Sequence, residues 1–321
     1  MTRAGLLAVA AAAVALTVAP PPGEPVVPRV VARVLGIAQD GGLPHLGCAR
    51  ECCVAARRDP ARAARVASLG LRVEPPGDGA PRIFIIDATP DFRSQVDRAL
   101  APRTFADRPP GLPVDGILLT HAHIGHYTGL MYLGRESMAA TAVPVYATRR
   151  MGEFLSTNGP WKRLVKGKHI ELRTIEPGRP FDLAPGLSAE PLRVPHREEE
   201  SDVVGFLVKG PSRRLLYIPD VDDWSRWDRD IASLVASVEI AVLDATFYSP
   251  GELGLRSLEE VPHPLVPSTM DRLEPLVKKG HRVIFIHLNH TNPALRRSSP
   301  EYLEIVRRGF EVAAEGLELP L

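Results

Sequence analysis

The chain has 321 residues, of which 45% are hydrophobic and 24% are charged. This composition excludes a wholly disordered protein. Lys and Arg total 39 against 38 Asp and Glu, a formal net charge of +1. A protein that binds nucleic acid mainly through its phosphates carries a basic excess, so no nucleic-acid partner is expected. The length suits one large domain or two smaller ones, and it is sufficient to bury a core.

The N-terminus has the pattern of a secretory signal peptide. Arg3 precedes an apolar run over Ala4–Ala19, and the prolines at 20–22 stop any helix. The run is shorter than the roughly 20 residues of a comfortable membrane span. We therefore predict an exported protein, periplasmic or secreted, with no stable membrane span after processing; an uncleaved anchor is the alternative. Residues 1–28 form the signal peptide and a Pro-rich linker, and residues 29–321 form a single domain.

Strand and helix patterns interleave through the rest of the chain. Short runs rich in Val, Ile and Leu predict strands at Val34–Ala38, Arg82–Asp87, Gly116–Thr120, Val143–Ala147, His169–Thr174, Leu192–Val194, Gly205–Val208, Leu215–Ile218, Ile240–Asp244 and Val283–His287. Apolar residues at i, i+3 and i+4 predict helices at Phe92–Leu100, Gly129–Ser137, Trp227–Val235, Thr269–Lys278 and Tyr302–Ala314. No stretch has the composition of an interdomain linker. The pattern favours an α/β protein, with two packed sheets or one large sheet and helices outside.

All three cysteines lie in one short stretch. Cys48, Cys52 and Cys53 occur in GCARECC, with His45 just upstream. Three thiols and a nearby imidazole could hold a structural zinc. Export would permit a disulfide, with one thiol left over. Three unpaired thiols packed as small apolar groups are the third alternative, and the spacing leaves all three open.

Three histidines follow an apolar strand in the stretch T-H-A-H-I-G-H. His121 and His123 are two residues apart, so they point the same way in extended backbone. His126 follows at the turn into a helix. Neutral imidazole is a ligand for zinc, iron and copper alike. This spacing predicts a metal site with an open position for water.

Further ligand types follow other apolar strands. His196, Asp220 and His287 each come at the carboxyl end of such a strand, where α/β proteins place their sites. His290 follows in HLNHTNP and competes with His287 as the ligand. His263 lies between two prolines, before a predicted helix.

The motif THAHIGH resembles the H-x-H-x-D-H motif of the metallo-β-lactamase-fold superfamily. The later single His, the Asp and the final His also occur in that family's order. The stretches GIAQDGGLPH, DATPDF, YIPD and HLNHTNP, with the cysteines, resemble the branch around the pyrroloquinoline quinone biosynthesis B protein. The resemblance implies an αββα sandwich with two mixed β-sheets flanked by helices. It also implies a paralogue of that protein, which departs from the H-x-H motif that is retained here.

The resemblance implies two metal sites. Carried over by position, the first metal is bound by His121, His123 and His196. The second is served by His126, Asp220 and His287, with Asp220 bridging both. One departure is that Gly125 stands where the family has Asp, so the second site lacks a carboxylate. The implied cofactor is one or two zinc ions, with iron as the alternative.

The implied function is that of a zinc-dependent hydrolase. Metal-bound hydroxide would attack an ester, lactone, amide or phosphodiester of a small-molecule substrate. Catalysis would involve the bridging Asp220 and His263, the latter protonating the leaving group, while Asp87 orients the histidine loop. Two alternatives stay open: a metal-dependent oxidase or hydroxylase linked to pyrroloquinoline quinone, which favours iron, and a non-catalytic metal-binding protein, which Gly125 favours. Weaker pocket candidates are Asp91, Tyr127, Asn289 and Thr291.

Overall fold

The structure is a computed structural model that describes residues 27–77, 79–253 and 259–321. All but the last two residues of the predicted signal peptide and linker lie outside these ranges. Within them, no helix is long and apolar enough to cross a membrane.

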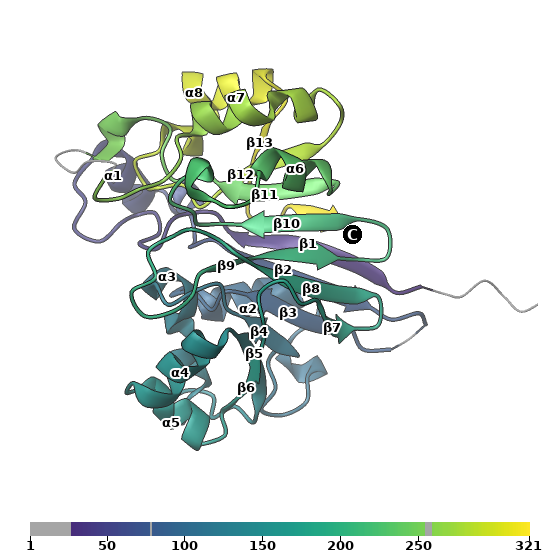
Figure 1. Cartoon of the computed structure of the whole chain (residues 1–321). Coiled ribbons are helices and arrows are strands. Elements are labelled where there is room, and N and C mark those ends of the chain that lie inside the picture. The colour runs from purple at the N-terminus through teal and green to yellow at the C-terminus, as the bar shows by residue number, and fades with distance from the viewer. Residues whose placement is uncertain (1–26, 78, 254–258) are drawn as a thin grey trace, which may run out of the picture.

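Two seven-stranded sheets face each other, with helices on the outside (Figure 1). The first sheet has, in spatial order, β14 (Glu318–Pro320), β1 (Arg29–Gly36), β2 (Ser68–Glu74), β3 (Arg82–Ile86), β4 (Gly116–Leu118), β5 (Val143–Ala147) and β6 (Ile170–Thr174). The second has β13 (Glu311–Val312), β12 (Arg282–Ile286), β11 (Ile240–Asp244), β10 (Arg214–Ile218), β9 (Val204–Lys209), β8 (Leu187–Arg193) and β7 (Phe181–Ala184). Each sheet is mixed: β3 to β6 and β10 to β13 are parallel runs, and the other neighbours are antiparallel.

The helices form the two outer layers. The first sheet is covered by α2 (Phe92–Leu100), α4 (Arg149–Thr157) and α5 (Trp161–Lys166), and the second by α6 (Ile231–Ala236), α7 (Val266–Val277) and α8 (Pro300–Arg307) (Figure 1). The remaining α-helices are α1 (Glu51–Arg58) and α3 (Ile124–Tyr127). Short 3-10 helices occur at Pro60–Arg62, Phe105–Asp107, Thr128–Leu133, Trp224–Arg226, Pro250–Leu253 and Pro293–Leu295.

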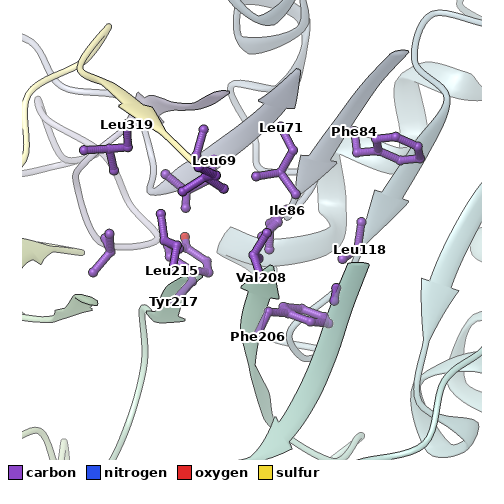
Figure 2. Packing of buried hydrophobic residues seen from close by; sticks show 14 of the residues in the cluster. Leu69, Leu71, Phe84, Ile86, Leu118, Phe206, Val208, Leu215, Tyr217 and Leu319 are labelled. Carbon is purple, nitrogen blue, oxygen red and sulfur yellow. The ribbon is translucent and has the colours of Figure 1, made fainter. Parts of the chain in front are cut away.

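Alternate side chains of a strand pack into different apolar layers of the sandwich. In β3, Phe84 and Ile86 belong to the apolar cluster between the sheets, while Ile83 and Ile85 belong to the cluster under α2 and α4. Figure 2 shows the inter-sheet cluster, where Leu69 and Leu71 from one sheet meet Val208 and Leu215 from the other. Successive side chains of a strand point to opposite faces, so each sheet buries both faces. The result is the αββα sandwich that the resemblance implies.

Several element boundaries differ from the sequence prediction. The sequence analysis does not predict β2, β7, β14, α1, α4 or α5. The helix predicted over Tyr302–Ala314 ends at Arg307, because Gly309 takes a positive φ of 85° and the chain then enters β13. The helix predicted over Gly129–Ser137 is a 3-10 helix, Thr128–Leu133, that stops at Gly134. The strand predicted to reach Thr120 ends at Leu118, because the Thr120 amide donates to the Asp87 side chain.

The parallel strands bring the polar residues together. Asp87 follows β3, Asp244 ends β11, and His287 follows β12 directly. The segment after β4 carries the three clustered histidines, and Asp220 comes two residues after β10. Because β10, β11 and β12 are parallel, as are β3 and β4, their carboxyl ends share one edge of the sandwich.

Candidate metal centre

One set of donor atoms comes from His121, His123, His196 and Asp220. Each offers one ligand atom, and the four atoms lie within 4.8 Å of one another. His196 Nε2 is 3.2 Å from His123 Nδ1 and 3.3 Å from Asp220 Oδ1. His121 Nε2 is 3.5 Å from Asp220 Oδ2. The structure thus brings together the residues that the resemblance assigns to the first metal, with Asp220 beside them.

A second set comprises His126, His287, Asp220 and Asp40. The Nε2 atoms of His126 and His287 lie 3.7 Å and 3.8 Å from Asp220 Oδ2. They lie 3.3 Å and 3.4 Å from Asp40 Oδ1. Asp220 therefore belongs to both sets, as the carry-over by position implies. Asp40 is absent from the sequence prediction, although it lies in the GIAQDGG stretch.

The other nitrogen of each of these five imidazoles is held by an outer partner. These contacts are His121 Nδ1 to Thr120 Oγ1 (3.0 Å), His123 Nε2 to Glu199 Oε2 (3.2 Å), His126 Nδ1 to Asp87 Oδ2 (2.8 Å), His196 Nδ1 to Asp222 Oδ1 (2.7 Å) and His287 Nδ1 to Thr246 Oγ1 (3.0 Å). Such partners fix the ring orientation and the tautomer of metal-binding histidines. The inward atoms are consequently Nδ1 of His123 and Nε2 of the other four.

Within the described part of the chain, three of the inward atoms are buried without a hydrogen-bond partner: His121 Nε2, His126 Nε2 and Asp220 Oδ1. A buried polar atom without a partner costs about 1–3 kcal/mol. Three such atoms on two shared donor sets are explained by a cation that accepts their lone pairs. Imidazole nitrogen and carboxylate oxygen are ligands that zinc takes in catalytic sites. The residues present therefore fit a metal ion.

Burial and neighbouring charge divide the histidines into two groups. Burial holds the pKa of His121 well below its ordinary value, and the neighbouring His126 charge adds to this effect. Burial also lowers the pKa of His123, against the opposing charge of Asp220. Both rings are therefore neutral near pH 7, the protonation state that a metal ligand needs.

Carboxylates reverse the burial effect at two other rings. At His126, burial lowers the pKa, but the charges of Asp87 and Asp40 and the hydrogen bond to Asp87 raise it well above its ordinary value. At His196, burial is outweighed by Asp220 and Asp222, which raise the pKa to about 10. In the metal-free protein these two rings carry protons that a metal must displace.

The bridging carboxylate is held ionised. Burial raises the pKa of Asp220, but the charges of His196 and His287 outweigh it and bring the pKa well below its ordinary value. Asp220 is therefore an anion near pH 7, available as a ligand without losing a proton.

Two residues that border the centre have a left-handed backbone. Asp87 has φ of 69° and His287 has φ of 63°. This region is uncommon for residues other than glycine and concentrates at functional sites, where surrounding contacts sustain it. At Asp87 these contacts are the Thr120 amide, 2.9 Å from Oδ1, and the His126 ring.

His263 lies beside Oδ1 of Asp220, whereas the imidazoles of the second set lie beside Oδ2. Its Nδ1 is 2.8 Å from Asp244 Oδ2 and 3.4 Å from Asp220 Oδ1. Asp244 is held by the Thr246 amide and hydroxyl, each 2.7 Å from Oδ1. Burial lowers the pKa of His263, but Asp244 outweighs it and raises the pKa. A carboxylate-supported, buried imidazole beside the metal ligands has the properties of a proton donor.

The cysteines form a separate cluster. Cys48, Cys52 and Cys53 are all free, and the Sγ atoms of Cys52 and Cys53 are 3.9 Å apart. Cys48, Cys53 and His290 offer donor atoms within 4.8 Å of one another. His45 stacks on His290, with 4.4 Å between ring centroids. The structure thus places His290 with the cysteines and His287 with the second donor set, and the imidazole that joins the thiols is that of His290 and not His45.

The weaker pocket candidates have structural contacts in the described residues. Asp91 accepts a hydrogen bond from the Val66 amide, and Tyr127 packs edge-on against Phe154 and Trp161. Asn289 donates to Thr291. None of these four residues enters either donor set. The outer partners Asp222, Asp244 and Thr246 escape the sequence analysis, because only the folded strands bring them to the histidines.

Comparison with known proteins agrees with this architecture. A model of the beta-lactamase superfamily domain matches residues 82–288. Coenzyme PQQ synthesis protein B of Cupriavidus necator is 31% identical over 313 residues, covering 90% of this chain and 99% of that protein. Zn²⁺-bound PqqB from Methylobacterium extorquens superposes with a TM-score of 0.75 at 24% identity, over 91% of this chain and 100% of the other. A diphosphatase of the PhnP family has a TM-score of 0.61 at 22% identity, over 91% and 97%.

The fold and the donor sets define a metal-binding protein with the metallo-β-lactamase fold. The chain belongs to the beta-lactamase superfamily, and within it to the branch of coenzyme PQQ synthesis protein B. Relatives of this branch match nearly the whole chain, and the superfamily domain covers every residue of the two donor sets except Asp40.

Proposed function

We propose that the protein is a zinc-dependent hydrolase that cleaves an ester, lactone, amide or phosphodiester bond in a small-molecule substrate. One observation carries the proposal: two donor sets share Asp220, and three of their buried atoms have no hydrogen-bond partner among the described residues. The zinc in one fold neighbour and the diphosphatase name of another support the choice of metal and of reaction type.

The residues of the two donor sets would hold the metal ions. His121, His123, His196 and Asp220 would hold the first ion, and His126, His287 and Asp220 the second. Zinc bound there supplies a Lewis acid and lowers the pKa of a coordinated water from about 15.7 toward 7.

His263 is proposed to give a proton to the leaving group. Asp244 keeps its Nδ1 hydrogen-bonded, at 2.8 Å, and so favours the protonated ring. After proton transfer, Asp220 and Asp244 favour recovery of a proton from water, so the imidazole can act again.

Elemental mass spectrometry of the purified protein, beside a panel of ester, lactone, amide and phosphodiester substrates, tests the proposal. We expect tightly held zinc, turnover that a chelator abolishes and zinc restores, and loss of both in the variant with His121→Ala and His123→Ala. An exposed-residue variant, Asp182→Asn, should behave as wild type. Full turnover in the double histidine variant would refute the proposal.

A second candidate function follows from the curated relatives. Coenzyme PQQ synthesis protein B of Cupriavidus necator matches over 90% of this chain. An iron-dependent oxidase or hydroxylase that acts in the chemistry of this cofactor is therefore the alternative. Oxygen consumption by the iron-loaded protein, with no hydrolysis by the zinc-loaded protein, would favour it. Metal binding without turnover of either kind would favour a non-catalytic metal-binding protein.

The cysteine cluster is proposed to hold a separate structural zinc. Cys48 and Cys53 supply thiols and His290 an imidazole, with donor atoms within 4.8 Å. Cys52 lies next to them in the chain. This ion would tie α1 to the segment after β12. Loss of one zinc equivalent and a lower melting temperature in Cys53→Ser, with the histidine sites still loaded, would be the expected result.

We also propose that the protein is exported, on the sequence pattern of residues 1–19 alone. Cell fractionation of the native host protein, with and without these residues, tests this. Retention of the full-length protein in the cytoplasm would contradict export.

A further inference from the structure

The second metal site has lost the carboxylate that its sequence motif ordinarily supplies. In THAHIGH the residue just before the third histidine is Gly125, where the family motif has Asp. From the motif alone, the second ion has only His126, His287 and the shared Asp220. The structure offers one more oxygen at this place, from a residue far away in the chain.

Asp40 occupies the space that a side chain at position 125 would fill. A Cβ built on Gly125 would lie 2.5 Å from both Cγ and Oδ1 of Asp40 and 2.7 Å from its Cα. Real Cβ atoms do not approach other heavy atoms so closely. A side chain at position 125 and the Asp40 carboxylate therefore exclude each other. Glycine at 125 leaves the space that the Asp40 side chain occupies.

The Asp40 oxygen has the spacing of a metal ligand. Ligands about 2.0–2.2 Å from a tetrahedral zinc lie about 3.3–3.6 Å from one another. Asp40 Oδ1 is 3.3 Å from His126 Nε2 and 3.4 Å from His287 Nε2. Those two nitrogens are the inward atoms of rings whose other nitrogens are engaged with Asp87 and Thr246. His126 Nε2 has no hydrogen-bond partner in residues 27–77, 79–253 and 259–321.

The loop that carries Asp40 is fixed to the segment that carries His287. The Gln39 amide donates to the Leu288 carbonyl at 2.9 Å, and the Leu288 amide donates to the Ile37 carbonyl at 2.9 Å. Ala38 and Leu288 form a parallel β-bridge. These backbone bonds hold residue 40 beside residue 287 without any metal, so the carboxylate is positioned in advance.

We infer that Asp40 is a ligand of the second metal and replaces, from the loop after β1, the aspartate that the family motif carries at position 125. The inference rests on the metal-binding centre of the proposed function. It assigns to the second site two imidazoles and two carboxylates, one of them shared with the first site. The chemistry of the donor set is then that of a complete dinuclear centre, although the motif is incomplete.

The test measures zinc binding and does not depend on turnover. Metal-free full-length protein is titrated with zinc against a chromophoric chelator, for wild type, Asp40→Asn, His126→Ala and the double variant. Loss of an outer partner weakens metal binding about 10–100-fold, and Asp40→Asn should weaken one zinc equivalent by at least the upper end of this range. The double variant should lose no further equivalent, because both changes act on one site. The matched control is Asp182→Asn, an exposed aspartate of β7.

A second variant removes no ligand. Gly125→Ala adds a Cβ that must push Asp40 aside, and we expect it to lose the same zinc equivalent as Asp40→Asn. Melting temperatures of the metal-free variants verify that each is folded. Asp40→Asn with two histidine-site equivalents at wild-type affinity would overturn this inference and leave the proposed function standing. Wild type without zinc at the histidines would overturn both.

Discussion

Replacing Asp87 by Asn tests whether the outer partner sets the tautomer of a metal ligand. Asp87 is fully buried, with Oδ1 2.9 Å from the Thr120 amide and Oδ2 2.8 Å from His126 Nδ1. An ionised carboxylate only accepts hydrogen bonds. It therefore keeps the hydrogen on Nδ1 of His126, so that the proton displaced by a metal is the one on Nε2, which faces the second donor set.

Asparagine keeps one acceptor oxygen, for Thr120, and turns an amide N–H₂ toward His126. Nδ1 must then accept, and the hydrogen moves to Nε2, where the metal would bind. We expect zinc binding at the second site to weaken about 10–100-fold, which is about 1.4–2.8 kcal/mol. The asparagine side chain tolerates the positive φ of 69°, so the fold should persist.

Alanine at position 87 makes a matched comparison. It leaves the Thr120 amide without its partner, which costs about 1–3 kcal/mol. It also places a residue with no local hydrogen bond in the left-handed region, for about 1–2 kcal/mol more. Chemical denaturation of the metal-free proteins should show Asp87→Ala less stable than wild type by about 2–5 kcal/mol, the sum of those two costs. Wild-type zinc affinity in Asp87→Asn would refute the tautomer argument.

Three further predictions concern protons and the core. Asp220 and Asp222 raise the pKa of His196 from 6.5 to about 10, against the effect of burial. The protonated His196 ring therefore stabilises the metal-free protein fully below pH 6.5, and this stabilisation is lost as the pH rises through about 10. Zinc binding should therefore release protons in that window, and calorimetry in buffers of different ionisation enthalpy should count them; a count of zero would contradict this. His263→Ala should keep its zinc but lose about 10²–10⁴-fold in kcat, most of all for substrates with poor leaving groups, and equal losses for good and poor leaving groups would argue against a proton donor. The buried Tyr217 hydroxyl has no hydrogen-bond partner among the residues that the structure describes, so Tyr217→Phe should raise the free energy of unfolding by about 1 kcal/mol. Denaturation midpoints would show this change, and a loss of stability would mean that the hydroxyl has a partner.

Local pattern predicted the layers where strands are short and apolar. The strands Val143–Ala147 and Ile240–Asp244 and the helix Phe92–Leu100 have the predicted bounds, because their residues alone show the period of the element. The sequence analysis misses β2, although Leu69, Leu71 and Val73 alternate along it. It fails for most of β8, because Pro191 is unusual inside a strand. There, pairing on both sides decides the conformation.

The site residues likewise divide into those that local sequence predicts and those that depend on long-range contacts. His121, His123 and His126 were predictable as a group because their spacing is local, and His196, Asp220 and His287 because each follows an apolar strand. Asp40 was not predictable, since nothing within its own stretch indicates that its side chain will reach His126 and His287, which lie 86 and 247 positions further along the chain. The thiols were found, but their imidazole partner is His290, which is 237 residues after Cys53.

The residue types that face the metal centre can be predicted without the fold, because ligand types at the ends of apolar strands are a local property of the chain. The folded chain selects which donors share an ion, which nitrogen of each ring faces inward and which carboxylate stands in for the missing one at Gly125. These choices depend on strand order and on the contacts between the segments that follow β1 and β12 and the histidine loop after β4. That information lies in contacts between distant residues. At Gly125, for example, the absence of a Cβ leaves the space that the Asp40 side chain occupies.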